Sequence, residues 1–327
     1  MFFTSAILGP FMLSASLWLL TFAWAFQAPI SLEPRLKPAA HPLRVDLRVN
    51  VPLVLIPVHV TNILGSSVTN LTREDFRLLE DNVEQHITHF SSEEAALSIG
   101  LLVDSSGSMR KKMKKSMAAV TTFFKTSNAE DEFFLIEFSD RPKLLAAFTQ
   151  DLNNIRTRLA RVRPFGRTAL LDAIRMAIEE MKTARNSRKV ILILSDGGDN
   201  RSRYTETEIK GLVSESDSQI YSMGIFDPGD SAKRTPEERH GPRLLSDLAE
   251  QTGGRHFPVN NLDDLPDICA RISTEFRSQY LLGYSPAHSA GNGKYRQVKV
   301  QVVSPPNAAT LKVHHRLGYY APDGAGW

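Results

Sequence analysis

The sequence predicts an α/β fold: a doubly wound, mostly parallel sheet flanked by helices, with a small flanking β domain built from N- and C-terminal segments. Two wholly apolar runs, 99–103 and 190–194, have the length of buried strands. Amphipathic segments with helical spacing separate these runs, which is the pattern of parallel strands joined by crossover helices. Before and after this region, polar and apolar residues alternate as they do in strands with one exposed face.

The composition is that of a globular protein with room for one large domain or two ordinary ones. The chain has 327 residues, of which 42% are hydrophobic and 23% are charged, and its formal net charge is +3. This charge is too small to imply a nucleic-acid partner. The single cysteine, Cys269, excludes an intramolecular disulfide, and its place on an amphipathic segment predicts that it lies in the core.

Residues 1–25 are predicted to be a signal peptide or a membrane anchor. Residues 1–28 carry no charged side chain, and Ala23-Trp24-Ala25 resembles a signal-peptide cleavage site. We therefore expect an exported protein, which is periplasmic, on the cell surface or secreted. A signal peptide usually opens with Lys or Arg, which this segment lacks, and its apolar length approaches the roughly 20 residues that span a bilayer. An uncleaved membrane anchor is the alternative.

The segments on either side of the α/β region are too short to form stable β domains separately. Residues 26–42 are a proline-rich linker, and residues 323–327 are a tail. We predict that the α/β domain, 97–277, is inserted between residues 43–96 and 278–322, which pair as two halves of one small β domain. Separate N- and C-terminal β units are the alternative. The strands expected in these segments are 45–51, 53–60, 76–79, 84–90, 280–284, 295–303 and 311–317.

Within the α/β domain, the elements are predicted from residue spacing and from the residues that interrupt it. Met113, Met117 and Val120 share one helix face, for example, and Pro164-Phe165-Gly166 interrupts the chain before the next helix. The strands expected are 101–103, 133–136, 144–148, 189–194 and 219–226. The helices expected are 109–125, 152–162, one that begins at Thr168, 205–214, 243–251 and 262–276.

Polar residues follow both apolar strands at the point where each strand ends. Asp104, Ser106 and Ser108 follow the first strand, Asp196 follows the second, and Thr168 stands at the mouth of a helix between them. Because the carboxyl ends of parallel strands meet at one edge of a sheet, we expect these five side chains to converge. Carboxylate and hydroxyl oxygens suit Mg²⁺, Mn²⁺ or Ca²⁺. A Ser/Asp turn that caps the next helix is the alternative for the first cluster.

The combined pattern resembles a von Willebrand factor type A domain over residues 97–276. The five polar residues match that family's metal-ion-dependent adhesion site one for one. The resemblance implies an intact site for Mg²⁺, or for Mn²⁺ or Ca²⁺, and a partner protein whose Asp or Glu carboxylate completes the coordination. It therefore implies a binding protein and not an enzyme.

Other features near the site are less specific. The flanks resemble, more loosely, a bacterial, Acidobacteria-type group of related proteins through the stretches 68–76, 280–284 and 318–320. Asp199 is interpreted as an exposed loop acid, with a role in the outer shell of the metal as the alternative. A basic stretch after the first cluster is suited to attract acidic partners, although a solvated helix face is the simpler interpretation for most of it. Its members are Arg110, Lys111, Lys112, Lys114 and Lys115.

Two other functions are compatible with the same residues. The first is a structural or assembly subunit of an envelope or surface complex, in which the metal stabilises the fold. The second is a metal-dependent hydrolase. Against the hydrolase, the sequence contains no G-x-S-x-G elbow and no evident general base near the metal. A zinc site is disfavoured because the His86/His89 and His314/His315 pairs are predicted to point to opposite sides of their strands.

Overall fold

The structure is a computed structural model that describes residues 53–226, 235–286, 293–303 and 310–321. The predicted signal peptide or anchor (1–25), the linker (26–42), the strand expected over 45–51 and the tail (323–327) lie outside these residues. Within the described ranges, no helix combines the length and the apolar character that crossing a membrane requires.

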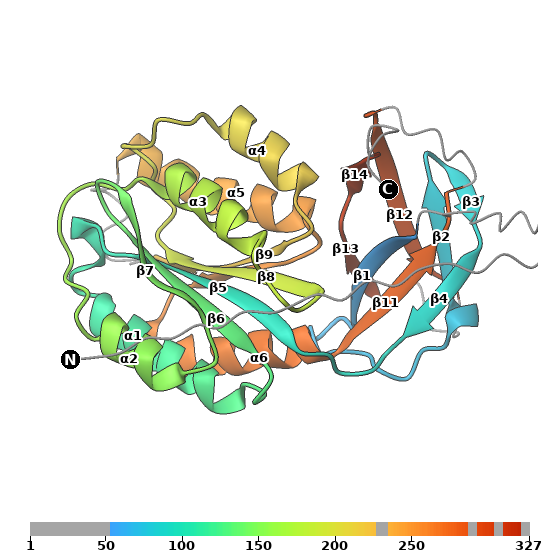
Figure 1. Ribbon diagram of the computed structural model, residues 1–327, viewed down its shortest axis with the longest axis horizontal. Helices are drawn as coiled ribbons and strands as arrows, with labels where there is room; N and C mark the ends of the chain where they lie inside the picture. Colours follow the sequence, from blue (N-terminus) through green and yellow to red (C-terminus); the bar gives the residue numbers. More distant parts are fainter. Residues whose placement is uncertain (1–52, 227–234, 287–292, 304–309, 322–327) are drawn as a thin grey trace, which may run out of the picture. The chain divides into compact units, whose positions relative to one another are not determined.

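In the described chain, the central sheet has six strands: β5 (Leu97–Asp104), β6 (Glu132–Phe138), β7 (Pro142–Thr149), β8 (Arg188–Ser195), β9 (Gln219–Ile225) and β10 (His256–Val259). Their order is β10-β9-β8-β5-β6-β7, and every pair is parallel except β6 with β7 (Figure 1). From β5 the chain builds outward through β6 and β7, and then builds β8, β9 and β10 on the other side. The predicted doubly wound, mostly parallel sheet is confirmed, and its winding reverses between β5 and β8.

Helices cover both faces of this sheet (Figure 1). Side chains of successive strand residues point to opposite faces of the sheet. Leu101 and Val103 therefore belong to one core cluster, and Leu102 belongs to the other. One face carries α1 (Met113–Phe123), α2 (Leu152–Leu159) and α6 (Leu265–Arg277), and the other carries α3 (Leu170–Met181), α4 (Glu206–Glu215) and α5 (Pro236–Gln251).

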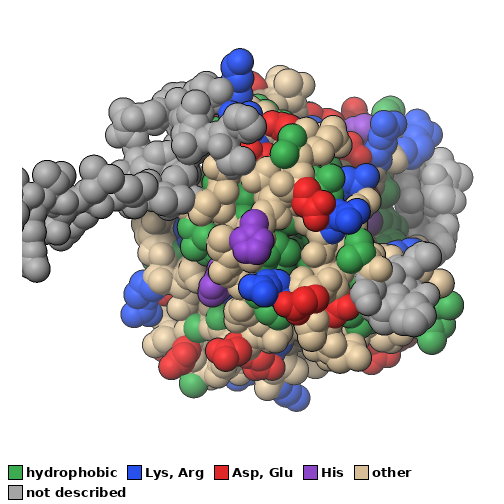
Figure 2. All heavy atoms as spheres, turned by 90° about the vertical axis from the view of Figure 1, so that its right-hand side faces the viewer, with side chains coloured by type: hydrophobic (Ala, Val, Ile, Leu, Met, Phe, Trp, Pro, Cys, Tyr) green, Lys and Arg blue, Asp and Glu red, His purple; other side chains and the backbone are tan. Residues whose placement is uncertain are grey.

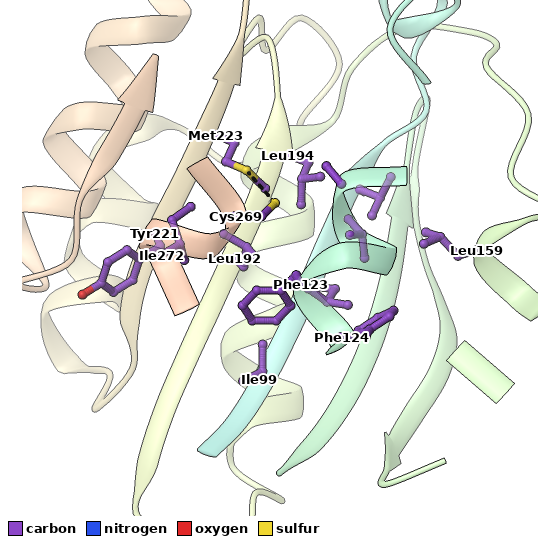
Figure 3. Close-up of a cluster of buried hydrophobic side chains, with 14 of the residues drawn as sticks. Ile99, Phe123, Phe124, Leu159, Leu192, Leu194, Tyr221, Met223, Cys269 and Ile272 are labelled. Atoms are coloured by element: carbon purple, nitrogen blue, oxygen red, sulfur yellow. Dashed lines mark hydrogen bonds between the residues drawn. The ribbon is translucent and has the colours of Figure 1, made fainter. Parts of the chain in front are cut away.

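The core beneath α1 and α6 is a cluster of buried aliphatic and aromatic side chains (Figure 3). Phe123 of α1 and Ile272 of α6 pack in this cluster together with Leu192 of β8. Cys269 is fully buried, and its thiol contacts the Met223 sulfur at 3.7 Å. Burial raises the pKa of this thiol to about 12, so Cys269 is a packing residue and not a reactive one.

Two helices differ from their predicted extents. The helix expected over 109–125 is divided, because α1 is flanked by short 3₁₀ turns over Gly107–Met109 and Phe124–Thr126. Helix α5 begins at Pro236 and not near residue 243, because Thr235 caps its first turn in a capping box. Pro242 lies inside α5, where a proline normally indicates a boundary, and this concealed the true start. Strand β10 has only four residues and was not expected.

Strands from before and after the α/β domain share two further sheets. The strands are β1 (Val54–Thr61), β2 (Phe76–Glu80), β3 (Val83–Gln85), β4 (Ile87–Ser91), β11 (Gln279–Tyr284), β12 (Tyr295–Val302), β13 (Lys312–His315) and β14 (Gly318–Tyr320). One sheet has the order β13-β1-β11-β4, and the other has the order β14-β12-β2-β3. Between them lies a third core cluster, in which the Tyr284 and Tyr319 hydroxyls both donate to the buried Glu80 carboxylate at 2.6 and 2.8 Å.

The strands expected over 76–79 and 84–90 are only partly correct. Strands β2 and β3 do form a hairpin, and its two turn residues, Asp81 and Asn82, have the positive φ angles, 48° and 65°, that such a tight turn requires. After Gln85, however, the chain passes to the other sheet, where β4 pairs with β11. The segment expected as one partner strand, 84–90, is therefore divided between two sheets.

Figure 2 shows one face of the molecule, on which Lys and Arg side chains are interspersed with Asp and Glu. Hydrophobic side chains on this face are scattered and not gathered into one area. This face therefore presents no continuous basic stripe of the kind that binds a nucleic-acid backbone.

Gly100 in β5 marks a point where the sheet has no room for a side chain. It lies opposite Phe134 of β6, and a Cβ at this position would lie 2.1 Å from the Phe134 ring. We expect Gly100→Ala to lower the free energy of unfolding, measured by urea denaturation, by about 1–3 kcal/mol because the ring must shift. In the control Gly211→Ala, a Cβ within α4 meets nothing within 4 Å. That change should be neutral or stabilising, by up to about 1 kcal/mol; similar losses in both variants would contradict the prediction.

Candidate metal centre

The predicted polar residues lie at the edge of the sheet where its winding reverses. Asp104 is the last residue of β5, and Ser195 is the last residue of the neighbouring strand β8. The parallel register places Val103 opposite Leu194, so the two strands end at the same level. In open α/β sheets, the crevice beyond such a reversal point is where ligands bind.

Asp104 is fully buried, and both of its carboxylate oxygens accept hydrogen bonds. Oδ1 accepts from the Ser106 backbone N–H at 2.8 Å, and Oδ2 accepts from the Ser195 hydroxyl at 2.6 Å. The Ser195 hydroxyl in turn accepts from the Gly197 N–H at 2.9 Å. Burial, and then the negative charge of nearby Asp196, raises the pKa of Asp104. The carboxylate is thus held rigidly in a place where a nearby cation would favour its charged form.

The first loop brings two hydroxyls together and joins the loop that carries the third. Ser106 and Ser108 have their side-chain oxygens 3.0 Å apart; Ser106 is buried and Ser108 is exposed. The Gly107 N–H donates to the Gly166 carbonyl at 3.0 Å, which links this loop to the segment before α3. Gly166 has a φ of +73°, and a Cβ there would lie 2.7 Å from the Asp140 carboxylate, so glycine suits both the conformation and the space.

Thr168 is buried, and its backbone is held on both sides. Its N–H donates to the Asn200 side-chain oxygen at 3.0 Å, and its carbonyl accepts from the N–H groups of Asn200 and Arg201. The loop after β8 therefore fixes the position of this residue, although the two segments are far apart in the sequence. The backbone of the first loop is joined to this segment by two hydrogen bonds, from the Gly107 N–H to the Gly166 carbonyl and from the Phe165 N–H to the Ser105 carbonyl.

The two carboxylate oxygens of Asp196 differ in their hydrogen bonding. Oδ2 accepts from the Lys112 ammonium at 3.2 Å, whereas Oδ1 is buried and accepts no hydrogen bond from any residue that the structure describes. The backbone next to it is tightly packed, because a Cβ on Gly197, whose φ is +78°, would lie 2.7 Å from the Gly241 backbone of α5. A buried carboxylate oxygen without a partner is costly unless it meets a cation or a donor.

The donor set fits a hard divalent cation. Carboxylates of Asp104 and Asp196 and hydroxyls of Ser106, Ser108 and Thr168 are oxygen ligands of the kind that Mg²⁺ and Ca²⁺ prefer. No group of three or more His, Cys, Asp or Glu side chains suited to a metal occurs among the described residues. The predicted set contains only two carboxylates, so it would depend on hydroxyls and on ligands from outside the chain. These five residues remain the predicted ligand set.

Asp199 has a structural role that the sequence did not indicate. Its Oδ1 accepts from the Leu170 and Leu171 N–H groups at 2.8 and 3.3 Å, and from the Ser202 hydroxyl at 2.6 Å. The residue at the N-cap of α3 is Ala169, which has no side-chain acceptor. Asp199, on another loop, therefore accepts the hydrogen bonds of N–H groups in the first turn of α3, which have no partner within the helix. It is therefore a helix-capping residue and not the simple exposed loop acid that was expected.

Sequence reasoning also missed the roles of Ser195 and Lys112. Ser195 directly precedes Asp196 and connects Asp104 with Gly197, but in the sequence it is only another polar residue at a strand end. Lys112 is one of several adjacent basic residues, and nothing in its spacing distinguishes it from its neighbours. Only the fold shows that its side chain reaches Asp196.

Part of the α/β domain matches a known protein family. Residues 99–198, which include all five predicted ligands, match the family described as "von Willebrand factor type A domain". Inter-alpha-trypsin inhibitor heavy chain H2 from Homo sapiens is 28% identical over 158 residues, or 43% of this chain and 17% of that protein. Heavy chain 4 from Mus musculus is 26% identical over 153 residues, or 42% of this chain and 16% of the relative. The chain thus matches only a small part of these relatives.

Solved structures include similar folds. A von Willebrand factor type A protein from Catenulispora acidiphila is 12% identical, with a TM-score of 0.47 and coverage of 83% of this chain and 75% of that one. The corresponding domain of the type V pili tip protein Mfa5 from Porphyromonas gingivalis is 13% identical, with a TM-score of 0.46 and coverage of 55% and 95%. The sheet order and the family match over residues 99–198 agree that the α/β domain has a fold like that of von Willebrand factor type A domains.

The hydroxyl of Ser195 is predicted to hold Asp104 in place. We expect Ser195→Ala to lower the free energy of unfolding in EDTA by about 1–3 kcal/mol, because a buried carboxylate oxygen loses its donor. Urea denaturation measures the effect, and Ser92→Ala, at an exposed serine, is the control. If both variants unfold like the parent chain, the Ser195 bond does not hold the carboxylate.

Proposed function

We propose that this chain binds a partner protein through a divalent cation, with an Asp or Glu carboxylate of the partner completing the coordination. The ion would be Mg²⁺, with Mn²⁺ or Ca²⁺ as alternatives, and when bound it supplies a concentrated positive charge that attracts the partner's carboxylate. The proposed ligands are Asp104, Ser106, Ser108, Thr168 and Asp196. Domains of the von Willebrand factor type A class commonly mediate protein–protein interaction or adhesion, which agrees with this proposal.

The observation that carries the proposal is the buried, unpartnered carboxylate oxygen of Asp196. Its Oδ1 is buried without a hydrogen-bond partner among the described residues, and it lies close enough to Asp104 to raise the pKa of that carboxyl. Two like charges at buried strand ends repel each other, so this edge of the sheet favours a cation. The hydroxyls of the adjoining loops provide neutral oxygens for the same ion.

The surroundings of the site favour an acidic partner. Arg110 and Lys111 follow the first loop, Arg167 precedes Thr168, and the Arg201 N–H donates to the Thr168 carbonyl. All four basic side chains are exposed, and none forms an ion pair with another described residue. A partner with several acidic residues near its coordinating carboxylate would be attracted at low ionic strength.

We further propose that the chain is exported, with an uncleaved membrane anchor as the alternative. The support is the uncharged, apolar segment 1–25, which ends in Ala23-Trp24-Ala25. A partner would then be sought in the periplasm, at the cell surface or in the medium.

Removing single hydroxyls tests the metal site without disturbing the buried carboxylates. We expect Ser108→Ala and Thr168→Val to weaken Mg²⁺ binding about tenfold or more. Even the loss of a residue that only hydrogen-bonds to a metal ligand lowers metal affinity about 10–100-fold. Isothermal titration calorimetry measures the dissociation constant. Thr157→Val, at an exposed position in α2, is the matched control and should bind Mg²⁺ like the parent.

The same variants separate binding from a structural role. If the proposal is correct, partner capture from the native exported fraction requires Mg²⁺, is lost in EDTA and is reduced in Thr168→Val. If Mg²⁺ raises the melting temperature but capture is insensitive to EDTA and to both substitutions, the metal stabilises the fold and does not bind the partner. If the parent chain binds no divalent cation, the proposed site is wrong.

A further inference from the structure

Lys112 is the one residue of the basic stretch whose side chain enters the proposed site. Its ammonium lies 3.2 Å from Asp196 Oδ2, and the two side chains are only 12% and 7% exposed. Lys115, three residues further along, also forms an ion pair, with Asp263 at 2.6 Å, but those side chains are 48% and 73% exposed. The Lys112 pair is therefore shielded from solvent, whereas the Lys115 pair is screened and weak.

The backbone of Lys112 is held by hydrogen bonds on both sides. Its N–H donates to the Met109 carbonyl at 2.9 Å, and its carbonyl accepts from the Ser116 N–H and hydroxyl, each at 3.0 Å. The ammonium is carried on a flexible four-carbon stem. The ammonium at Asp196 is thus a cation carried by a flexible side chain on a fixed backbone.

The position of Lys112 at the start of α1 does not explain its contact with Asp196. Lys112 directly precedes α1, and the N-terminus of a helix carries partial positive charge, which disfavours a cation. The first turn of α1 contains no acidic residue that would offset this charge. The attraction that holds the ammonium comes from Asp196, on the loop after β8, which is 84 residues away in the sequence.

We propose that Lys112 is a built-in counter-cation of the metal site, which balances Asp196 in the metal-free chain and must be displaced when a divalent cation binds. This inference rests on the proposed function, because it concerns the same site. It implies that Lys112 lowers the affinity for the metal and stabilises the chain without it. It also implies selectivity, since Na⁺ or K⁺ brings only the single charge that the tethered ammonium already supplies, whereas Mg²⁺ brings two.

The experiment compares Lys112→Met with Lys115→Met in the 327-residue chain. Both variants remove one positive charge from the same stretch, but only the first removes it from the site. After treatment with EDTA and dialysis, each protein is titrated with MgCl₂ in the calorimeter, and its melting temperature is measured in EDTA and in MgCl₂. Lys112→Arg, which keeps the charge, is a third variant.

We expect Lys112→Met to bind Mg²⁺ about tenfold more tightly than the parent, which corresponds to about 1.4 kcal/mol. In EDTA its melting temperature should fall, because Asp196 loses its counter-charge, and the rise on adding MgCl₂ should exceed that of the parent. Lys115→Met should match the parent in both measurements, and Lys112→Arg should not bind Mg²⁺ more tightly. A residue with only a structural role would lower the melting temperature with and without Mg²⁺ and would not improve the affinity.

Failure of this inference is distinct from failure of the proposed function. If the parent binds Mg²⁺ and Lys112→Met binds it equally or less tightly, Lys112 is not a competitor, and the metal site stands. If Lys115→Met tightens binding as much as Lys112→Met, the effect is one of general charge, and the inference is wrong. If neither the parent nor Lys112→Met binds Mg²⁺, both the inference and the proposed function are overturned.

Discussion

Two acidic residues, Asp104 and Asp196, are buried where two adjacent parallel strands of the α/β domain end. The register of β5 and β8 brings Asp104 and Asp196 to one edge of the sheet, where the charge of Asp196 helps to raise the pKa of Asp104. Neighbouring groups offset this cost in different ways. Ser195 and the Ser106 N–H donate to one carboxylate, and the Lys112 ammonium pairs with the other. Burial of acidic groups costs stability unless each charge is paired or hydrogen-bonded, and both acids here have such partners.

Close backbone contacts make it possible for separate loops to meet around these acids. Gly107 binds the Gly166 carbonyl, and Gly197 packs on Gly241 at a distance that excludes any side chain. The Gly107 bond joins the loop after β5 to the segment before α3, and the bonds from the Asn200 and Arg201 N–H groups to the Thr168 carbonyl join that segment to the loop after β8. The hydroxyls that these loops carry are therefore positioned by backbone packing, before any ion is considered. Such preorganisation reduces the loss of conformational freedom when a ligand binds.

The parts that the sequence predicted well are those that depend on local pattern. Apolar runs indicated β5 and β8, and the polar residues that follow these runs do lie at the ends of the two strands. The assignment of these residues as metal ligands remains a prediction. The errors arose where distant residues decide the outcome. Pro242 lies inside α5 because Thr235 caps the helix earlier, and Asp199 caps α3 because Ala169 cannot. Lys112 is one of several equivalent bases until the fold places Asp196 beside it.

The proposed site is better suited to binding a carboxylate than to cleaving a bond. Both oxygens of Asp104 already accept hydrogen bonds, so much of its negative charge is shared with Ser195 and the backbone. An ion held largely by neutral hydroxyls keeps more of its positive charge for an incoming ligand than one held by several carboxylates. Displacement of Lys112 from Asp196 would leave a further cation beside that ligand. Metal binding and recognition of an acidic partner would therefore reinforce each other at this edge of the sheet.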